Sequence, residues 1–152
     1  MIIWLASYPK SGNTWVKLFL SAYLGNQNSS RPFDINKMLI PFSLFPTHNL
    51  IKKFNFDFSN FKNIAEHWIP MQEYLNLSTK GNIFVKTHNV MCTINENKFT
   101  NKQNSLGAIY VVRDPRDIII SYSSFLKKSY DEVAAYLFSS ESFELSNIDG
   151  KQ

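Results

Sequence analysis

The sequence predicts an α/β fold, a three-layer sandwich in which helices cover both faces of a central parallel sheet. Short continuous apolar runs are typical of strands buried on both faces, and helical patterns separate these runs along the chain. The runs are Ile2–Ala6, Ile83–Thr87 and Ala108–Val112. The chain has 152 residues, of which 44% are hydrophobic, so it can bury one core, and we expect a single domain over residues 1–152.

The first helix is predicted between Asn13 and Leu24, where Gly25 ends it. Polar residues interrupt its apolar pattern only at Lys17 and Ser21, so we expect most of this helix to be buried. The expected buried stripe repeats at helical spacing and consists of Trp15, Leu18, Phe19, Ala22 and Tyr23.

The middle of the chain has weaker patterns. Residues 33–58 contain aromatic residues and prolines without a clear period, and we expect irregular structure with short helical turns there. A second helix is predicted from Phe61 through Leu77, broken or restarted near Pro70. A turn at Lys80–Asn82 then leads into the second strand.

Two helices with clear capping signals follow the third strand. Asp114 is placed as the N-cap of the first of them, and Pro115 as its first residue. The second begins with Ser129 and Glu132 at the spacing of a capping box. We expect the polar tail, residues 139–152, to be poorly ordered. The predicted buried side of the first of these helices consists of Ile118, Ile119, Tyr122, Phe125 and Leu126.

Charge and composition limit the classes of partner. The 16 Lys and Arg residues against 12 Asp and Glu leave a net charge of +4 without a long basic run. This balance favours a small anionic ligand at least as well as nucleic acid, and we expect no nucleic acid partner. Lys17 interrupts the longest apolar run, which is too short to span a membrane, and the apolar N-terminus is too short for a signal peptide. A single cysteine cannot form an internal disulfide, so we expect a cytoplasmic protein.

Polar and cationic residues follow each predicted strand. The loop Ser7–Trp15 follows the first strand, Lys86–His88 ends the second, and Arg113–Arg116 follows the third. Ligands of an open parallel sheet bind at the carboxyl ends of its strands, so these segments should converge on one ligand. Gly12 allows close approach of the backbone, and the N–H groups of the next helix favour an anion. A phosphate or a sulfate is the expected ligand, although each residue by itself also fits a solvated or packing role.

These three segments resemble the sulfotransferase family that uses 3'-phosphoadenosine 5'-phosphosulfate (PAPS). Tyr8–Trp15 is similar to the family's 5'-phosphosulfate loop, Lys86–His88 to its catalytic strand end, and Val112–Tyr122 to its 3'-phosphate motif. They occur in the family's order, and the resemblance covers the chain to about residue 138. It implies a P-loop-like fold and transfer of a sulfuryl group from PAPS to a hydroxyl or amine of a small-molecule acceptor.

The resemblance also implies roles for individual residues. Lys10 and the next four residues would hold the 5'-phosphosulfate, and Lys10 would neutralise charge on the leaving oxygen. Trp15 would stack on the adenine, although its helical phase equally suits a core residue. Arg113 and Ser121 would bind the 3'-phosphate. The implied donor-binding residues are Lys10, Ser11, Gly12, Asn13, Thr14, Trp15, Arg113 and Ser121.

The same resemblance makes His88 the candidate general base, a neutral imidazole that takes the proton of the acceptor. Lys86 would stabilise the transferring group together with Lys10. Because these cations can supply the positive charge that the reaction needs, no metal is expected. His48 and His67 have no supporting partners in the sequence, and we expect them at the surface or in packing.

The sequence departs from the family pattern in several respects. Asn13 replaces the common Thr but keeps a hydrogen-bonding side chain, and Asn89–Val90 replaces the Leu-Pro that often follows the histidine in animal enzymes. Family members also continue for on the order of 100 further residues, including an Arg-Lys-Gly loop over the nucleotide. We therefore expect a domain that is incomplete at its C-terminus, with acceptor selectivity in residues 33–58 and in the downstream part.

Two other functions remain open. A truncated nucleotide-binding module would hold PAPS or its product 3'-phosphoadenosine 5'-phosphate (PAP) without turnover, completed by a partner chain or by a second copy in a homo-oligomer. A P-loop kinase acting on a small molecule is disfavoured, because the loop lacks the Gly-x4-Gly-Lys-Ser/Thr order and no Asp placed to hold Mg²⁺ ends a strand.

Overall fold

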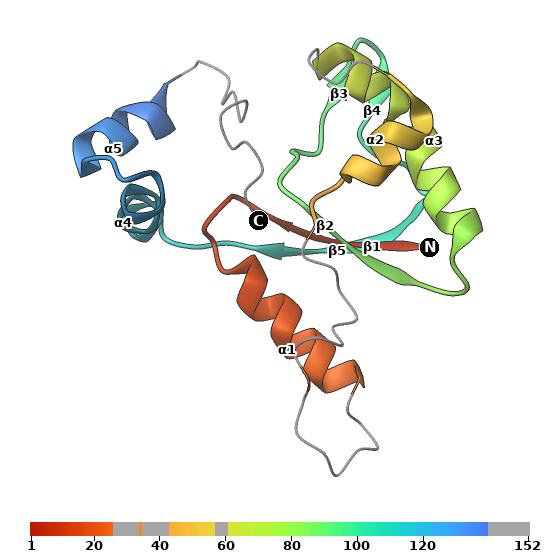
Figure 1. The fold of residues 1–152 in the computed structure, drawn as a ribbon, viewed down its shortest axis with the longest axis horizontal. Coiled ribbons are helices and arrows are strands. Elements are labelled where there is room, and N and C mark those ends of the chain that lie inside the picture. The colour runs from red at the N-terminus through yellow and green to blue at the C-terminus, as the bar shows by residue number, and fades with distance from the viewer. Residues whose placement is uncertain (26–33, 35–42, 57–60, 140–152) are drawn as a thin grey trace. The chain divides into compact units, whose positions relative to one another are not determined.

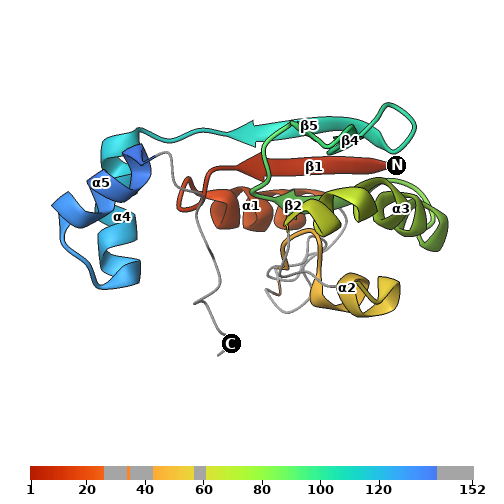
Figure 2. The ribbon, with the colours of Figure 1, turned by 90° about the horizontal axis from the view of Figure 1, so that it is seen from above.

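The computed structural model is built around a parallel β-sheet of three strands in the order β2-β1-β5. β1 (Ile2–Ser7) lies between β2 (Ile83–Thr87) and β5 (Ser105–Val111), and Figure 2 shows the strands side by side. In the register of the sheet, Leu5 of β1 lies opposite Lys86 of β2. The three predicted strands are confirmed, with β5 beginning earlier than expected. The expected burial of the third strand on both faces is wrong, because most residues of β5 are exposed, including Leu106 and Tyr110.

The structure describes residues 1–25, 34, 43–56 and 61–139. The chain falls into two compact units, Met1–Val112 and Arg113–Gln152. The expectation of one domain over the whole chain therefore remains a prediction. The predicted tail lies outside the described residues except for Ser139.

Helices lie on both faces of the sheet in the first unit. α1 (Asn13–Gly25) lies on one face, and α2 (His48–Phe54) and α3 (Phe61–Ser78) lie on the other (Figure 1). Large apolar side chains on the α3 side each contribute about 1.5–3 kcal/mol when fully buried. This arrangement confirms the predicted α/β fold with a parallel sheet between helices. The buried residues of this core are Ile2, Trp4, Phe45, Leu50, Ala65, Trp68, Met71 and Phe99.

The first unit also contains a small antiparallel hairpin of β3 (Thr93–Ile94) and β4 (Asn97–Lys98). Sequence analysis missed this hairpin, because strands of two residues are too short to show a period. α2 is one of the helical turns expected in the irregular region. Thr47 caps α2, since its hydroxyl oxygen accepts a hydrogen bond from the backbone N–H of Leu50 at 3.3 Å.

α3 continues through Pro70 without interruption. The predicted break near this residue is wrong. A proline inside a helix removes one backbone hydrogen bond and costs roughly 3 kcal/mol. The neighbouring side chains of Trp68 and Met71 are fully buried in the core, and this packing holds the helix on both sides of the proline while the proline ring itself is exposed.

α1 turns its polar side, rather than its apolar side, toward the protein. Its buried residues are Asn13, Lys17 and Ser21, whereas Trp15 is 79% exposed and Phe19 is 66% exposed. The predicted buried stripe is therefore wrong. Because α1 is apolar almost all round, hydrophobicity could not select the face that packs. The choice is fixed by hydrogen bonds from Asn13 to β1, which bring the polar face against the strand.

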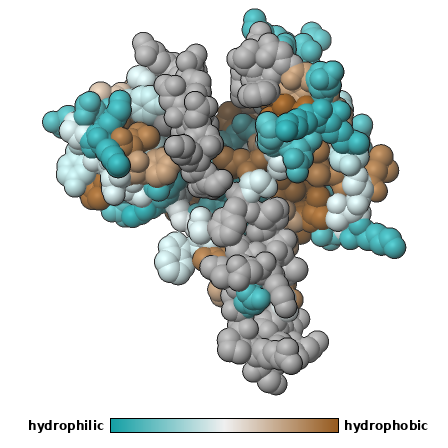
Figure 3. All heavy atoms as spheres, viewed as in Figure 1, coloured by the Kyte–Doolittle hydropathy of each residue, from teal (hydrophilic) through white to brown (hydrophobic). Residues whose placement is uncertain are grey.

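The second unit consists of α4 (Pro115–Leu126) and α5 (Tyr130–Phe138). Both predicted caps are confirmed: the Asp114 carboxylate accepts from the Arg116 backbone N–H at 2.9 Å, and Ser129 with Glu132 forms a capping box. Of the predicted buried side, Phe125 is wrong, since it is 51% exposed. Figure 3 shows hydrophobic residues (brown) at the molecular surface. The small core between α4 and α5 is formed by Ile118, Tyr122 and Val133, with Ile119, Leu126 and Leu137 against it.

Candidate functional site

The loop between β1 and α1 forms an open cradle. Lys10 has φ 65° and Gly12 has φ 101°, both in the left-handed region, which glycine adopts without strain. A Cβ atom added to Gly12 would meet nothing within 4 Å, so the space beside it is free. The Ser11 hydroxyl is buried and has no hydrogen-bond partner among the described residues. A buried hydroxyl, backbone N–H groups at a helix start and a lysine suit an anion such as a phosphate.

Hydrogen bonds from Asn13 hold this loop against β1. Its side-chain amide donates to the Leu5 carbonyl oxygen and to the Ser7 hydroxyl oxygen, both at 3.1 Å. The residue is 5% exposed, whereas Thr14 beside it is exposed. Asn13 therefore orients the start of α1 and the loop before it.

His88 lies at the carboxyl end of the sheet, directly after β2. Its Nδ1 atom is 2.7 Å from the backbone carbonyl oxygen of Ser7, and the Ser7 hydroxyl oxygen is 3.3 Å from the same nitrogen. A carbonyl oxygen can only accept a hydrogen bond. We therefore assign the proton to Nδ1, which leaves Nε2 as the nitrogen that can accept a proton.

The surroundings of His88 keep the imidazole neutral. Burial lowers its pKa below the ordinary 6.5, the hydrogen bond to Ser7 opposes this, and the positive charges of Lys86 and Lys17 lower it further. Burial also lowers the pKa of Lys86. An imidazole that is neutral at pH 7 with a free Nε2 is suited to act as a base.

Lys17 belongs to this electrostatic group, and sequence analysis did not identify it as a site residue. Its side chain is fully buried, with 0% exposure. Burial, and then the charge of Lys86, lower its pKa to about 8. The signal that could have identified Lys17 is its position as a lone charge in an otherwise apolar helix, since a lysine is almost never fully buried without a reason.

A pocket of about 450 Å³ opens beside His88. It lies on the α3 side of the sheet, because Trp4 of β1 forms part of both the pocket and the core on that side. Aromatic and apolar side chains dominate its wall, and burial raises the pKa of the Tyr8 hydroxyl at its edge. Such a wall suits the apolar body of a small molecule. The lining includes Trp4, Tyr8, His88, Met91, Phe99 and Tyr110.

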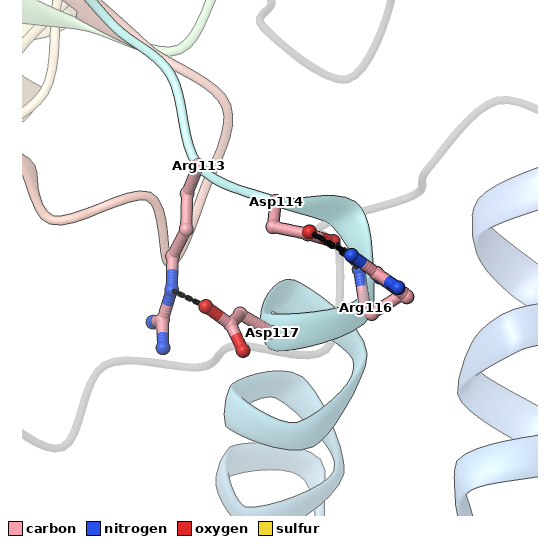
Figure 4. A network of polar contacts seen from close by, with 4 residues as sticks. All are labelled: Arg113, Asp114, Arg116 and Asp117. Atoms are coloured by element: carbon pink, nitrogen blue, oxygen red, sulfur yellow. Dashed lines mark hydrogen bonds and ion pairs between the residues drawn. The ribbon is translucent and has the colours of Figure 1, made fainter.

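The second unit carries the remaining predicted site residues, Arg113 and Ser121. Nε of Arg113 is 3.6 Å from a carboxylate oxygen of Asp117, and a guanidinium nitrogen of Arg116 is 2.6 Å from a carboxylate oxygen of Asp114 (Figure 4). These contacts with Arg116 lower the pKa of Asp114 to about 2. Asp117 and Ser121 are spaced four apart on α4 and therefore share a face of the helix.

Comparison with known proteins identifies the family. The family model described as "Sulfotransferase domain" matches residues 2–148, and the chain therefore belongs to the sulfotransferase family. It is similar to Cytosolic sulfotransferase 1 of Arabidopsis thaliana, with 29% identity over 131 residues that cover 86% of this chain. The chain spans only 36% of the length of that relative.

These comparisons confirm the predicted membership of the sulfotransferase family. Within the described ranges, no helix is both long enough and apolar enough to cross a membrane. Nor do the described His, Cys, Asp and Glu side chains form a group of three or more that could hold a metal ion.

Proposed function

We propose that this chain carries the donor site and the catalytic base of a sulfotransferase that uses PAPS and acts on a hydroxyl or amine of a small molecule. Bound PAPS supplies an electrophilic sulfuryl group, so that a bond forms between sulfur and the acceptor atom while the bond between sulfur and the phosphate oxygen breaks.

The observation that carries the proposal is the hydrogen bond between Nδ1 of His88 and the Ser7 carbonyl oxygen at 2.7 Å. It leaves Nε2 free to take the proton of the acceptor. Burial and the neighbouring lysines, which lower the pKa of the imidazole, keep this nitrogen available at neutral pH. His88 is thus the general base in the proposal.

The acceptor would occupy the pocket beside His88. Its aromatic and apolar wall, of about 450 Å³, supports an acceptor with an apolar body that places a hydroxyl or amine at the imidazole. Lys86 is close enough to His88 to lower its pKa, so its ammonium group is available to stabilise negative charge on the transferring group. Lys10 would act on the same charge from the loop.

The donor's 5'-phosphosulfate fits the loop between β1 and α1. The free space beside Gly12 and the buried Ser11 hydroxyl support binding of a phosphate there through Lys10, Ser11, Gly12, Asn13 and Thr14. Trp15 is 79% exposed, which argues against a core role and supports stacking on the adenine. We assign the 3'-phosphate to Arg113 and Ser121.

The proposal is tested by separating donor binding from turnover. PAP should bind the chain at micromolar concentration, and Arg113→Ala should abolish that binding. Sulfate transfer from PAPS to a panel of phenols, alcohols and amines should be lost in His88→Ala while PAP still binds. His67→Gln is the matched control, because His67 lies on α3 and outside residues 33–58, and its loss should leave both measurements unchanged.

Two results would contradict the proposal. Unchanged transfer in His88→Ala would show that His88 is not the general base. Binding of ATP with Mg²⁺, without binding of PAP, would point to a kinase. PAP binding without transfer to any acceptor would instead favour the nucleotide-binding module. Because that relative is named cytosolic, we extend a cytoplasmic location to this chain within the same proposal.

A further inference from the structure

Lys17 and Lys86 lie on the same face of the central sheet. Leu5 and Lys86 are opposite each other in the register of β1 and β2, and paired residues in a sheet point to the same side. Leu5 is fully buried, and its carbonyl oxygen accepts from Asn13 on the buried face of α1. Lys17 is one helical turn beyond Asn13 on that face. The two ammonium groups therefore come from opposite elements into one layer, between α1 and the sheet.

The arrangement places positive charges near one another, with Lys17 fully buried and Lys86 partly buried. Lys17 is the one charged residue of α1, Lys86 faces it from β2, and His88 follows two residues after Lys86. Like charges that share a buried site disfavour any further positive charge in it. Protonation of His88 would add a third positive charge to the same group.

We propose that Lys17 is a positioning residue of the catalytic site. Its ammonium group lies near that of Lys86, and the two positive charges of this lysine pair keep the His88 imidazole neutral until an anionic donor binds. The lysine pair means Lys17 and Lys86. Lys17 touches neither the donor nor the acceptor and acts only through His88, whereas Lys86 also keeps its proposed role beside the transferring group.

The pair also makes the strength of the base depend on the donor. An anion in the loop between β1 and α1 offsets the positive charge of the pair, so protonation of His88 becomes less unfavourable once the donor is bound. His88 is then a weak base in the free protein and a stronger base in the donor complex. This second step rests on the proposed function, whereas the effect of Lys17 on His88 in the free protein does not.

The first test is an NMR titration of the histidine ring protons in the free protein. The resonance of His88 is assigned by its loss in His88→Gln, and its midpoint in the wild type should lie below 6.5. Lys17→Met should move the midpoint upward toward that ordinary value, and Lys17→Arg, which keeps the charge, should leave it low. Lys52→Met is the matched control, since Lys52 is an exposed lysine on α2, and it should cause no shift.

If Lys17→Met prevents folding, Lys86→Met tests the same pair from the strand and should also raise the midpoint. The inference is overturned if the variant that folds titrates like the wild type, or if Lys17→Arg raises the midpoint as much as Lys17→Met does.

The second test repeats the titration with saturating PAP. The midpoint of His88 should rise on binding in the wild type and should rise less in Lys17→Met. An equal rise in both proteins, or no rise in the wild type with PAP bound, overturns the coupling to the donor. Failure of PAP to bind would count against the proposed function and the coupling, while the comparison in the free protein would still decide the role of Lys17.

Discussion

Nδ1 of His88 lies 2.7 Å from the carbonyl oxygen of Ser7, although the two residues are separated by 81 positions in the sequence. The bond ties the end of β2 to the end of β1 and fixes which nitrogen of the ring carries the proton. The position of the base is thus set by the pairing of the two strands.

We expect nitrogen NMR of His88 to show a protonated Nδ1 and an unprotonated Nε2 at neutral pH. Ser7→Ala should leave this tautomer in place, because the acceptor of the 2.7 Å bond is a backbone carbonyl and not the hydroxyl. A protonated Nε2 in the wild type would show that the ring cannot act as the base in this orientation.

The pH dependence of turnover should follow the titration of His88. A general base must be neutral, so kcat/KM for PAPS, which reports the protein before the donor binds, should rise with pH through the pKa of His88 and become constant above it. That pKa lies below 6.5 in the free protein, chiefly because the ring is buried and also because two lysines are near. The rising limb should therefore lie below pH 6.5, and Lys86→Met should move it upward. A limb above pH 6.5 in the wild type would contradict this assignment.

Lys17→Met should stabilise the protein most at low pH. In the folded state the pKa of Lys17 is about 8, against 10.5 for an ordinary lysine. The buried charge of Lys17 therefore lowers the free energy of unfolding below pH 8, and this loss disappears as the pH rises to 10.5. At about 1.4 kcal/mol per pKa unit, and allowing for lost contacts of the ammonium group, we expect a gain of roughly 1–3 kcal/mol at pH 7. Urea unfolding at several pH values measures it, and a gain that does not shrink between pH 8 and pH 10 would contradict the prediction.

Asp117→Asn should strengthen PAP binding. The Asp117 carboxylate pairs with Arg113 at 3.6 Å, so it competes with a phosphate for the guanidinium group and repels the phosphate itself. An exposed ion pair is worth up to about fivefold in affinity, and calorimetric titration with PAP should detect a gain of that size at low salt. Asp131→Asn, which removes an exposed carboxylate from α5, is the control. Weaker binding in Asp117→Asn would mean that the carboxylate holds Arg113 in place for the ligand.

Gly12→Ala should separate the strain of the loop from its binding role. Gly12 has φ 101°, so alanine there should cost about 1–2 kcal/mol of stability, although no neighbour lies within 4 Å of the new methyl group. The methyl group would occupy the space that the proposed phosphate needs, and PAP affinity should fall at least tenfold. Gly81→Ala is matched in backbone strain, with φ 86° and equally open surroundings, and should lose stability but keep PAP binding.

The sequence was most informative where structure is decided locally. The caps at Asp114 and Ser129 depend on neighbours within a few residues, and the strands show as apolar runs, so both could be predicted. The burial of the strands could not, since β5 is mostly exposed although its sequence is apolar. The packing face of α1 could not, because apolar residues surround that helix and the decisive bonds run from Asn13 to β1.

The candidate site also has features that the sequence could predict and features that it could not. The strand ends indicated which residues belong to it, including Lys10, Lys86 and His88. The orientation of His88 depends on a carbonyl oxygen that is distant in sequence, and the burial of Lys17 depends on how α1 packs on the sheet. Neither relationship leaves a periodic signal that a sequence alone could reveal.

The order of the strands has a consequence for synthesis of the chain. β1 is made first, yet its hydrogen-bonding neighbours are β2 and β5, which end at Thr87 and Val111. Until Val111 has left the ribosome, an apolar segment near the N-terminus has one unpaired edge or two. Such long-range parallel pairing forms slowly and leaves the nascent chain open to aggregation. Yield in cells should therefore respond to chaperone capacity and to translation rate before Val111 more than to changes on the surface of the folded protein.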